Sequence, residues 1–357
     1  MRDYVGHTHL WRPVTGIERI TAQLFSQQAL APLDVVPVTA ATMGGMMVTQ
    51  TLGLPARLAR SPSSLLLCPG FPPTPLLVPF GARVIPYIHD LFLLSRRQDL
   101  NWRARLYSAR PFGLAVRRLP RFMVNSADTA AKLAAYCRLD ADIVVYRPPA
   151  QNVFNLHPAD RPGRAAHEAG FRLATLGTVE PRKNLPGAAR IVEALRAHGH
   201  DATLDIVGRR GWGDDWERLS AMPGVTLHGY QPAAQVSEIL GRADALICTS
   251  HEEGLGLPLL EAQFAGLPVI APDQPVFREV LGASGIFIDP ARPNAAAVAI
   301  ELHFAPPDWR KIFVQLAAEN LRRWNRAATA DRDRAVDWLA RLLRERASIR
   351  RQFGVAH

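Results

Sequence analysis

Two glutamates that flank a glycine-rich segment are the residues of this sequence best suited to bind a polar ligand. Glu253 and Glu261 lie eight positions apart, and Gly254, Gly256 and Pro258 stand between them. Glycines let backbone N–H groups approach a ligand closely, and a helix N-terminus favours an anion. A polyol joined to a phosphate would suit this segment, because carboxylates accept from hydroxyls and N–H groups donate to phosphate.

The elements around these glutamates follow the order strand, glycine loop, helix. The apolar run 245–248 (Ala-Leu-Ile-Cys) is typical of a buried parallel strand. Pro258 suits the first turn of a helix, where its missing N–H costs nothing. We therefore expect Glu253 in the loop and Glu261 about two turns further along the chain, in the helix.

A basic pair follows a second strand. Arg182 and Lys183 belong to Gly177-Thr-Val-Glu-Pro-Arg-Lys-Asn184, which follows the apolar run 173–176 and opens a helix. Arginine offers a planar fork and lysine a point charge, and both stabilise a departing diphosphate. The alternative is a basic helix start on the surface, but a cation at a helix N-terminus opposes the helix dipole.

The spacing Glu-x7-Glu, followed by Gly266-Leu-Pro-Val-Ile270, resembles the donor-binding signature of retaining GT-B glycosyltransferases of the family-four type (glycosyl transferases group 1). The basic segment 177–184 is similar to another element of that family. So are Tyr87-Ile-His-Asp-Leu91 and Thr15-Gly-Ile-Glu-Arg19. The resemblance covers most of the chain and is strongest over 173–290.

The resemblance implies transfer of a sugar from a nucleoside diphosphate to an acceptor hydroxyl, with retention at the anomeric carbon. It gives catalytic roles to His89, Arg182, Lys183 and Glu253, and leaves open which of the two cations contributes more. Glu253 would hold sugar hydroxyls and Glu261 the ribose. The implied donor-binding set is Gly16, Arg182, Lys183, Gly208, Tyr230, Glu253, Gly254, Leu255, Gly256, Leu257 and Glu261.

The resemblance implies neither a cofactor nor a metal ion, since the nucleotide-sugar is a substrate and the sequence places no Asp-x-Asp element between strands. Cys68, Cys137 and Cys248 lie far apart, in apolar surroundings. They form neither a metal-binding pattern nor an obvious disulfide framework, which favours a reducing cytosol.

Alternating strand and helix patterns predict an α/β fold of parallel sheets. The resemblance makes this two Rossmann-like, doubly wound domains facing across a cleft. We expect an acceptor-binding domain over 1–165, a nucleotide-sugar domain over 166–325, and a helical segment over 326–357 that returns to brace the first domain. The polar, proline-rich stretch 147–170 is the expected linker. A break in the last helical region is expected near 327–333.

The chain carries a net charge of +10, and arginine supplies almost all of the basic residues. Many arginines gather between Arg96 and Arg121, interleaved with aromatic and aliphatic residues. This pattern favours an anionic membrane surface as a partner, with a solvated helix face as the alternative. No recognised nucleic-acid motif accompanies it. No apolar run reaches the roughly 18 residues of a membrane span.

The sequence thus predicts a metal-independent hexosyltransferase, cytoplasmic or peripheral on the inner face of the plasma membrane. The resemblance favours GDP-mannose as the donor, and the segment Arg96–Arg121 favours a saccharide carried by a polyprenyl diphosphate as the acceptor, in polysaccharide or O-antigen assembly. A nucleotide-sugar epimerase or phosphorylase on the same fold is an alternative. So is a membrane- or polyanion-binding protein with a degenerate site. The sugar, base, linkage and oligomeric state stay open.

Overall fold

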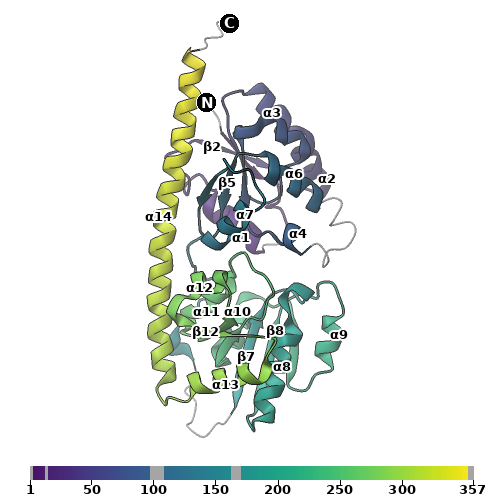
Figure 1. The fold of residues 1–357 in the computed structure, drawn as a ribbon, viewed down its shortest axis with the longest axis vertical. Coiled ribbons are helices and arrows are strands. Elements are labelled where there is room, and N and C mark those ends of the chain that lie inside the picture. The colour runs from purple at the N-terminus through teal and green to yellow at the C-terminus, as the bar shows by residue number, and fades with distance from the viewer. Residues whose placement is uncertain (1–2, 13–14, 97–107, 162–169, 353–357) are drawn as a thin grey trace. The chain divides into compact units, whose positions relative to one another are not determined.

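The computed structural model describes residues 3–12, 15–96, 108–161 and 170–352 (Figure 1). The chain forms two compact units. The first comprises 1–149 and 327–357, and the second comprises 150–326. The chain passes from the first unit to the second at Pro149/Ala150, within the stretch 147–170 expected as linker and earlier than the expected domain boundary at 165/166.

The first unit is built on a parallel sheet of six strands. Its strand order is β2-β1-β3-β4-β5-β6, so the order reverses between β1 and β3. Every strand is short and mostly apolar, as expected for strands covered on both faces. The strands are β1 (Asp3–His7), β2 (Val35–Thr39), β3 (Leu66–Cys68), β4 (Val84–Ile88), β5 (Arg121–Val124) and β6 (Asp142–Val145).

Helices of the first unit connect these strands. A helical segment runs from 43 to 60. The sequence patterns did not predict it, because its glycines and β-branched residues lower helix propensity. Its middle turn is a π-helix. The elements are α1 (Gly16–Leu24), α2 (Met43–Val48), η1 (Thr49–Gly53), α3 (Leu54–Arg60), η2 (Pro75–Arg83), α4 (Phe92–Ser95), α6 (Arg110–Arg118) and α7 (Ala127–Ala134).

The second unit also contains a parallel sheet of six strands. Its order is β12-β11-β10-β7-β8-β9, and the reversal lies between β7 and β10. In sequence order within the unit this is the 3-2-1-4-5-6 arrangement of dinucleotide-binding folds. The strands are β7 (Phe171–Leu176), β8 (Ala202–Val207), β9 (Val225–Gly229), β10 (Ala245–Ile247), β11 (Val269–Pro272) and β12 (Gly285–Ile288).

Helices and short turns of the second unit pack on both faces of its sheet (Figure 1). They are η5 (Pro158–Asp160), η6 (Pro181–Lys183), α8 (Leu185–Ala197), α9 (Asp215–Ser220), α10 (Ala233–Arg242), α11 (Leu257–Ala262), η7 (Gln263–Ala265), α12 (Pro275–Leu281), η8 (Gly282–Ser284) and α13 (Pro293–Phe304). The prediction of two Rossmann-like α/β domains is confirmed.

A single helix, α14 (Trp309–Gln352), ends the described chain. The expected break near 327–333 is wrong, because no glycine or proline interrupts this stretch and both parts of the helix find a buried partner. Trp324 is fully buried in the core of the second unit. Trp338 packs in the first unit, where its Nε1 donates to the Asp142 carboxylate at 2.6 Å.

Candidate active site

The predicted basic pair and Glu253 meet at the carboxyl ends of β7 and β10. This is the point where the strand order of the second sheet reverses, and open α/β sheets bind ligands at such points. A hollow there is lined by the ends of both strands together with Lys183, Glu253 and Gly256. Its volume of about 20 Å³ leaves room for little more than a water molecule, so the polar side chains close on one another.

Glu253 is the centre of this cluster and is only 8% exposed. Its Oε1 accepts from Lys183 Nζ at 2.6 Å and from the Ser250 hydroxyl at 2.7 Å. Its Oε2 accepts from Arg182 Nη1 at 3.1 Å. Three residues predicted separately from two loops therefore form one ion-paired group.

A second carboxylate, which the sequence did not single out, completes the cluster. Glu180 Oε1 accepts from Arg182 Nη2 at 2.8 Å and from Nε at 3.1 Å. Arg182 Nη1 also donates to the Glu252 carbonyl at 3.0 Å. Two cations and two carboxylates give the group a formal charge of zero. The available signal was the proximity of Glu180 to the basic pair in the sequence.

The cations keep Glu253 ionised. Burial alone would raise the pKa of Glu253, but Lys183 and Arg182 outweigh that effect and lower it to about 2. A carboxylate with this pKa does not act as a proton donor or acceptor near neutral pH. Its function is to hold charge and to accept hydrogen bonds.

Two glycines allow the cations to lie where they do. Gly177 ends β7 with a φ of +144°, and a Cβ there would lie 3.3 Å from Cε of Lys183, which crosses over it. At Gly208, after β8, a Cβ would lie 1.8 Å from the Gly177 carbonyl oxygen. Asn184 then turns the chain at a φ of +48°, and its side chain donates to the Thr249 carbonyl at 3.1 Å.

The glycine loop after β10 leads into α11 as predicted. Gly256 has a φ of +82°, a backbone conformation that favours glycine, and precedes the first helical residue. Gly254 and Leu255 are buried, Leu257 is half-buried, and Glu261 is buried within α11. The donor-binding roles of these residues stay predictions.

Two members of the implied donor-binding set, Gly208 and Tyr230, lie beside the edge strand of the same sheet. Gly208 N donates to the Gly229 carbonyl at 2.9 Å, so this N–H belongs to the sheet, and the missing side chain serves strand packing. Tyr230 is exposed, and the guanidinium of Arg209 lies 4.6 Å from its ring centroid. Tyr230 presents an aromatic surface that already pairs with a cation.

His89 and Gly16 belong to the first unit. His89 follows β4, and its Nε2 lies 2.6 Å from the Pro69 carbonyl. A carbonyl only accepts, so Nε2 carries the proton and Nδ1 has the lone pair. Burial lowers the pKa of His89, which favours the neutral ring. Gly16 begins α1, where the Glu18 carboxylate accepts from Thr15 N at 3.0 Å.

His9, a buried histidine just after β1, lies in the same region and is not among the predicted site residues. His9 Nε2 lies 2.9 Å from the Thr21 hydroxyl, and burial lowers the pKa of His9 to about 4. A Cβ at Gly70, after β3, would lie 2.2 Å from the His9 ring. The end of the first sheet therefore carries two histidines that burial favours in the neutral form, close to the ionised Glu18 and its ion pair with Arg12.

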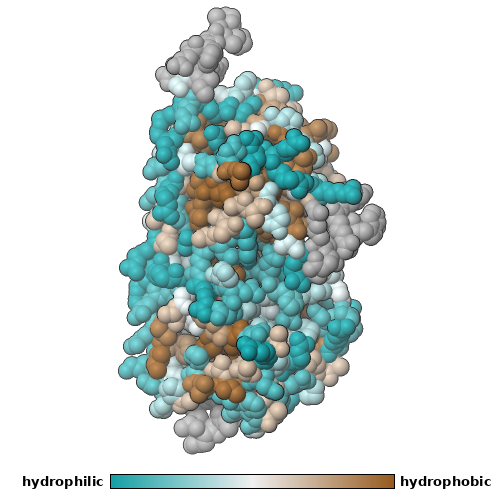
Figure 2. Space-filling view, viewed as in Figure 1, coloured by the Kyte–Doolittle hydropathy of each residue, from teal (hydrophilic) through white to brown (hydrophobic). Residues whose placement is uncertain are grey.

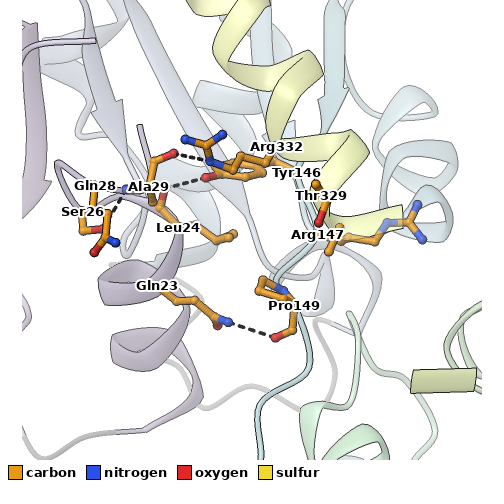
Figure 3. Close-up of a pocket in the computed structure, with 11 residues that line it drawn as sticks. Gln23, Leu24, Ser26, Gln28, Ala29, Tyr146, Arg147, Pro149, Thr329 and Arg332 are labelled. Atoms are coloured by element: carbon orange, nitrogen blue, oxygen red, sulfur yellow. Dashed lines mark hydrogen bonds between the residues drawn. The ribbon is translucent and has the colours of Figure 1, made fainter. Parts of the chain in front are cut away.

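A separate hollow of about 460 Å³ lies in the first unit, beside α1 and α14, and contains none of the predicted site residues (Figure 3). Gln23 donates to the Pro149 carbonyl at 3.0 Å, and Arg332 Nε donates to the Ala29 carbonyl at 2.9 Å. The Tyr146 hydroxyl donates to the Leu24 carbonyl at 2.8 Å. These contacts tie the chain near Pro149 to the first unit.

Part of the chain is similar to a described family of proteins. Residues 170–304 match glycosyl transferases group 1. The chain is 35% identical over 159 residues to the serotype-specific mannosyltransferase WbdA of Escherichia coli, which covers 43% of this chain and 19% of that protein. It is 32% identical over 143 residues to the O-antigen chain mannosyltransferase B of E. coli, covering 38% of each. The chain thus spans well under half the length of these relatives.

Solved structures share the fold over nearly the whole chain. Sucrose-phosphate synthase from Thermosynechococcus elongatus superposes with a TM-score of 0.66 at 17% identity, covering 99% of this chain and 100% of that one. WaaG, a glycosyltransferase involved in lipopolysaccharide biosynthesis, gives 0.61 at 16%, covering 94% and 99%. HepE from Anabaena, in complex with UDP and glucose, gives 0.64 at 15%, covering 95% and 99%.

Proposed function

We propose that this chain, whose residues 170–304 match glycosyl transferases group 1, transfers a hexose from a nucleoside-diphosphate sugar to a hydroxyl of a saccharide, with retention at the anomeric carbon. The observation that carries the proposal is the cluster of Lys183, Arg182 and Glu253 at the reversal point of the second sheet. Such a position receives the phosphates of nucleotides in doubly wound folds.

The geometry suggests how a diphosphate is accommodated. An arriving diphosphate competes with Glu253 for the two cations, because its oxygens carry more negative charge than one carboxylate. Lys183 has a flexible stem, and its ammonium donates one hydrogen bond to this carboxylate. The ammonium can therefore turn to the phosphate. Arg182 keeps its position through Glu180. The cations then stabilise the charge that develops on the departing nucleoside diphosphate.

The same exchange frees Glu253 to bind the sugar. When Lys183 turns away, Glu253 Oε1 retains the Ser250 hydroxyl and gains capacity for a sugar hydroxyl. The carboxylate stays ionised, in keeping with its low pKa, and acts as an acceptor only. The departing phosphate would take the acceptor proton in a front-face reaction, with His89 Nδ1 available as a hydrogen-bond acceptor for the incoming hydroxyl.

We propose GDP-mannose as the donor, and the names of the two E. coli relatives support mannose as its sugar. The test is a thermal-shift panel of GDP-, UDP-, dTDP- and ADP-sugars on the wild type, Glu261→Ala and the exposed control Glu238→Ala. A ligand at about 100 times its dissociation constant stabilises the native state by about 2.7 kcal/mol. We expect GDP-mannose to shift the wild type and the control but not Glu261→Ala.

A shift with another nucleotide class would replace the proposed donor. No shift with any of the four, in a folded protein, would contradict the donor site. A further part of the proposal is that transfer needs no metal ion, and activity that survives excess EDTA would support it. Among the described residues no group of three or more His, Cys, Asp or Glu side chains is placed to hold a metal.

We propose a polyprenyl-diphosphate-linked saccharide as the acceptor, in polysaccharide or O-antigen assembly at the cytoplasmic face of the membrane. The basic segment Arg96–Arg121 would contact anionic lipid. Its residues 97–107 lie outside the described part, but Arg110, Arg117 and Arg118 are exposed on α6. Transfer to lipid-linked but not to free saccharide would support this acceptor. None of the described helices combines the length and the apolar character needed to cross a bilayer.

A further inference from the structure

The helical segment 43–60, formed by α2, η1 and α3, exposes large apolar side chains along one side. Met43 is 51% exposed, Met47 61%, Val48 61% and Leu52 60%. The opposite side packs into the core of the first unit through Met46, Leu54 and Leu58. In a helix, residues four positions apart are neighbours, so Met43 lies beside Met47 and Val48 beside Leu52. We call these four residues the apolar face.

Single exposed apolar residues are common on proteins, but four large ones within ten residues of one helical segment favour an interaction surface. On the side of the molecule seen in Figure 2, apolar residues form separate patches within a largely hydrophilic surface. The apolar face therefore needs a partner that covers methionine, valine and leucine side chains.

The charged residues of the helical segment are both basic. Residues 43–60 contain two arginines and no acidic residue. Arg57 and Arg60 are exposed at the end of the same helical segment. The exposed arginines of α6 lie nearby, because α3 and α6 both pack against η2 and the three helices α2, α3 and α6 are neighbours in Figure 1.

We propose that the helical segment 43–60 docks on an anionic lipid bilayer. The apolar face would enter the boundary between headgroups and acyl chains, and Arg57, Arg60 and the arginines of α6 would contact lipid phosphates. A symmetric contact with a second copy would bring arginine-rich surfaces against each other, which costs repulsion. A nucleic acid would leave the apolar face uncovered. An anionic bilayer satisfies both the apolar and the basic residues.

The other side of the segment reaches the end of the first sheet. Gln50, in the π-helical turn η1, donates from Nε2 to the Thr8 hydroxyl at 2.9 Å, directly after β1. Docking would thus hold the carboxyl ends of these strands near the lipid headgroups. If the proposed function holds, this is where the saccharide of a lipid-linked acceptor would be presented, but docking itself needs no transfer activity.

The test measures sedimentation of the full chain with vesicles of phosphatidylcholine containing phosphatidylglycerol, and with vesicles of phosphatidylcholine alone. The variant Met43→Ser/Met47→Ser/Leu52→Ser removes most of the apolar face. The control Val298→Ser/Leu302→Ser removes two exposed apolar residues of α13 in the second unit, 46% and 68% exposed. We expect the triple variant to bind anionic vesicles at least about tenfold more weakly and the control to bind within about twofold of the wild type.

A second variant separates the electrostatic part. Arg57→Gln/Arg60→Gln should weaken binding to anionic vesicles and reduce its dependence on salt, with the apolar face intact. Wild-type-like binding of the triple variant, or no binding of the wild type to anionic vesicles, would overturn the proposal. A wild-type dimer that the triple variant abolishes would identify a second copy as the occupant instead.

Melting curves keep the interpretation clear. The triple variant should unfold cooperatively at a temperature close to that of the wild type, because its substituted residues are exposed. Its thermal shift with the donor sugar should also persist, because the donor site belongs to the other unit. Vesicle binding without any donor shift would contradict the proposed transfer and leave the docking surface standing.

Discussion

The two sheets end in different chemistry at their reversal points. In the second unit, the end of β7 and β10 carries four charged side chains bound to one another. In the first unit, the end of β1, β3 and β4 carries His9 and His89, whose pKa burial lowers, and the ion pair of Arg12 with Glu18. The Thr8 hydroxyl and the Gln50 amide add further neutral polar groups there.

This difference indicates which part of a substrate each unit suits. A balanced ionic cluster binds a ligand that itself carries charge, because the ligand replaces one internal partner at little desolvation cost. Neutral donors and acceptors suit hydroxyl groups. The contrast agrees with the proposed function, in which the second unit binds a charged donor and the first unit binds a hydroxyl-bearing acceptor.

The largest effect is expected at the centre of the charged cluster. Glu253→Ala removes the carboxylate that positions Lys183 and Arg182, so we expect kcat for hexose transfer to fall about 100- to 1,000-fold. The protein should stay folded, because Glu180 still pairs with Arg182. Steady-state kinetics with the donor found by thermal shift, together with melting curves, would check this.

The matched control is Glu238→Ala. It removes an exposed glutamate of α10 that forms a surface ion pair with Arg242. Its kcat should stay within about twofold of the wild type, since surface ion pairs contribute little. Near-normal transfer by Glu253→Ala would remove the charged cluster from the mechanism.

The next effect concerns the pH dependence that Glu253 gives to the free energy of unfolding. The pKa of Glu253 is about 2 in the folded chain against an ordinary value of 4.5, so the ionised form favours folding. This stabilisation, about 3 kcal/mol, is present above pH 5 and is lost as pH falls towards 2. Urea midpoints at pH 6 and pH 3.5 should differ less in Glu253→Gln than in the wild type. Equal pH dependence in the two proteins would contradict the depressed pKa.

A smaller effect tests the backbone that supports the cluster. In Gly208→Ala the new Cβ meets the Gly177 carbonyl oxygen at 1.8 Å, so β7 and β8 must separate at their ends. We expect a loss of about 1–3 kcal/mol in the free energy of unfolding. The control Gly241→Ala meets no atom within 4 Å in α10 and should stabilise the chain by about 0.4–1 kcal/mol. Equal urea midpoints for both variants would contradict this account.

The features that could be predicted from the sequence are those that depend on local residue patterns. Apolar runs bounded by glycines located most strands, and both Rossmann-like units followed from their alternation with helices. The charged cluster was not predictable as a cluster, because Lys183 and Glu253 become neighbours only once β7 and β10 lie side by side. The pairings of Glu180 and Ser250 depend on the same long-range arrangement.

Other features were hidden by composition. The helical segment 43–60 contains Gly44, Gly45 and Gly53 and includes a π-helical turn, so helix propensity alone disfavours it. Packing of Met46, Leu54 and Leu58 into the core supplies the stability that propensity does not. The continuity of α14 was missed for a related reason, because a helix that packs against two units shows no single apolar period.

The smallest effect belongs to the first unit and completes the contrast. Tyr146→Phe removes the hydroxyl that donates to the Leu24 carbonyl beside the hollow in Figure 3, and we expect a loss of about 1 kcal/mol in the free energy of unfolding. Burial raises the pKa of Tyr146, so this loss should be the same at pH 6 and pH 3.5. Tyr136→Phe, at an exposed tyrosine, is the control and should change nothing. A loss at Tyr146 that varied with pH as the Glu253 contribution does would contradict a hydrogen bond donated by a neutral hydroxyl.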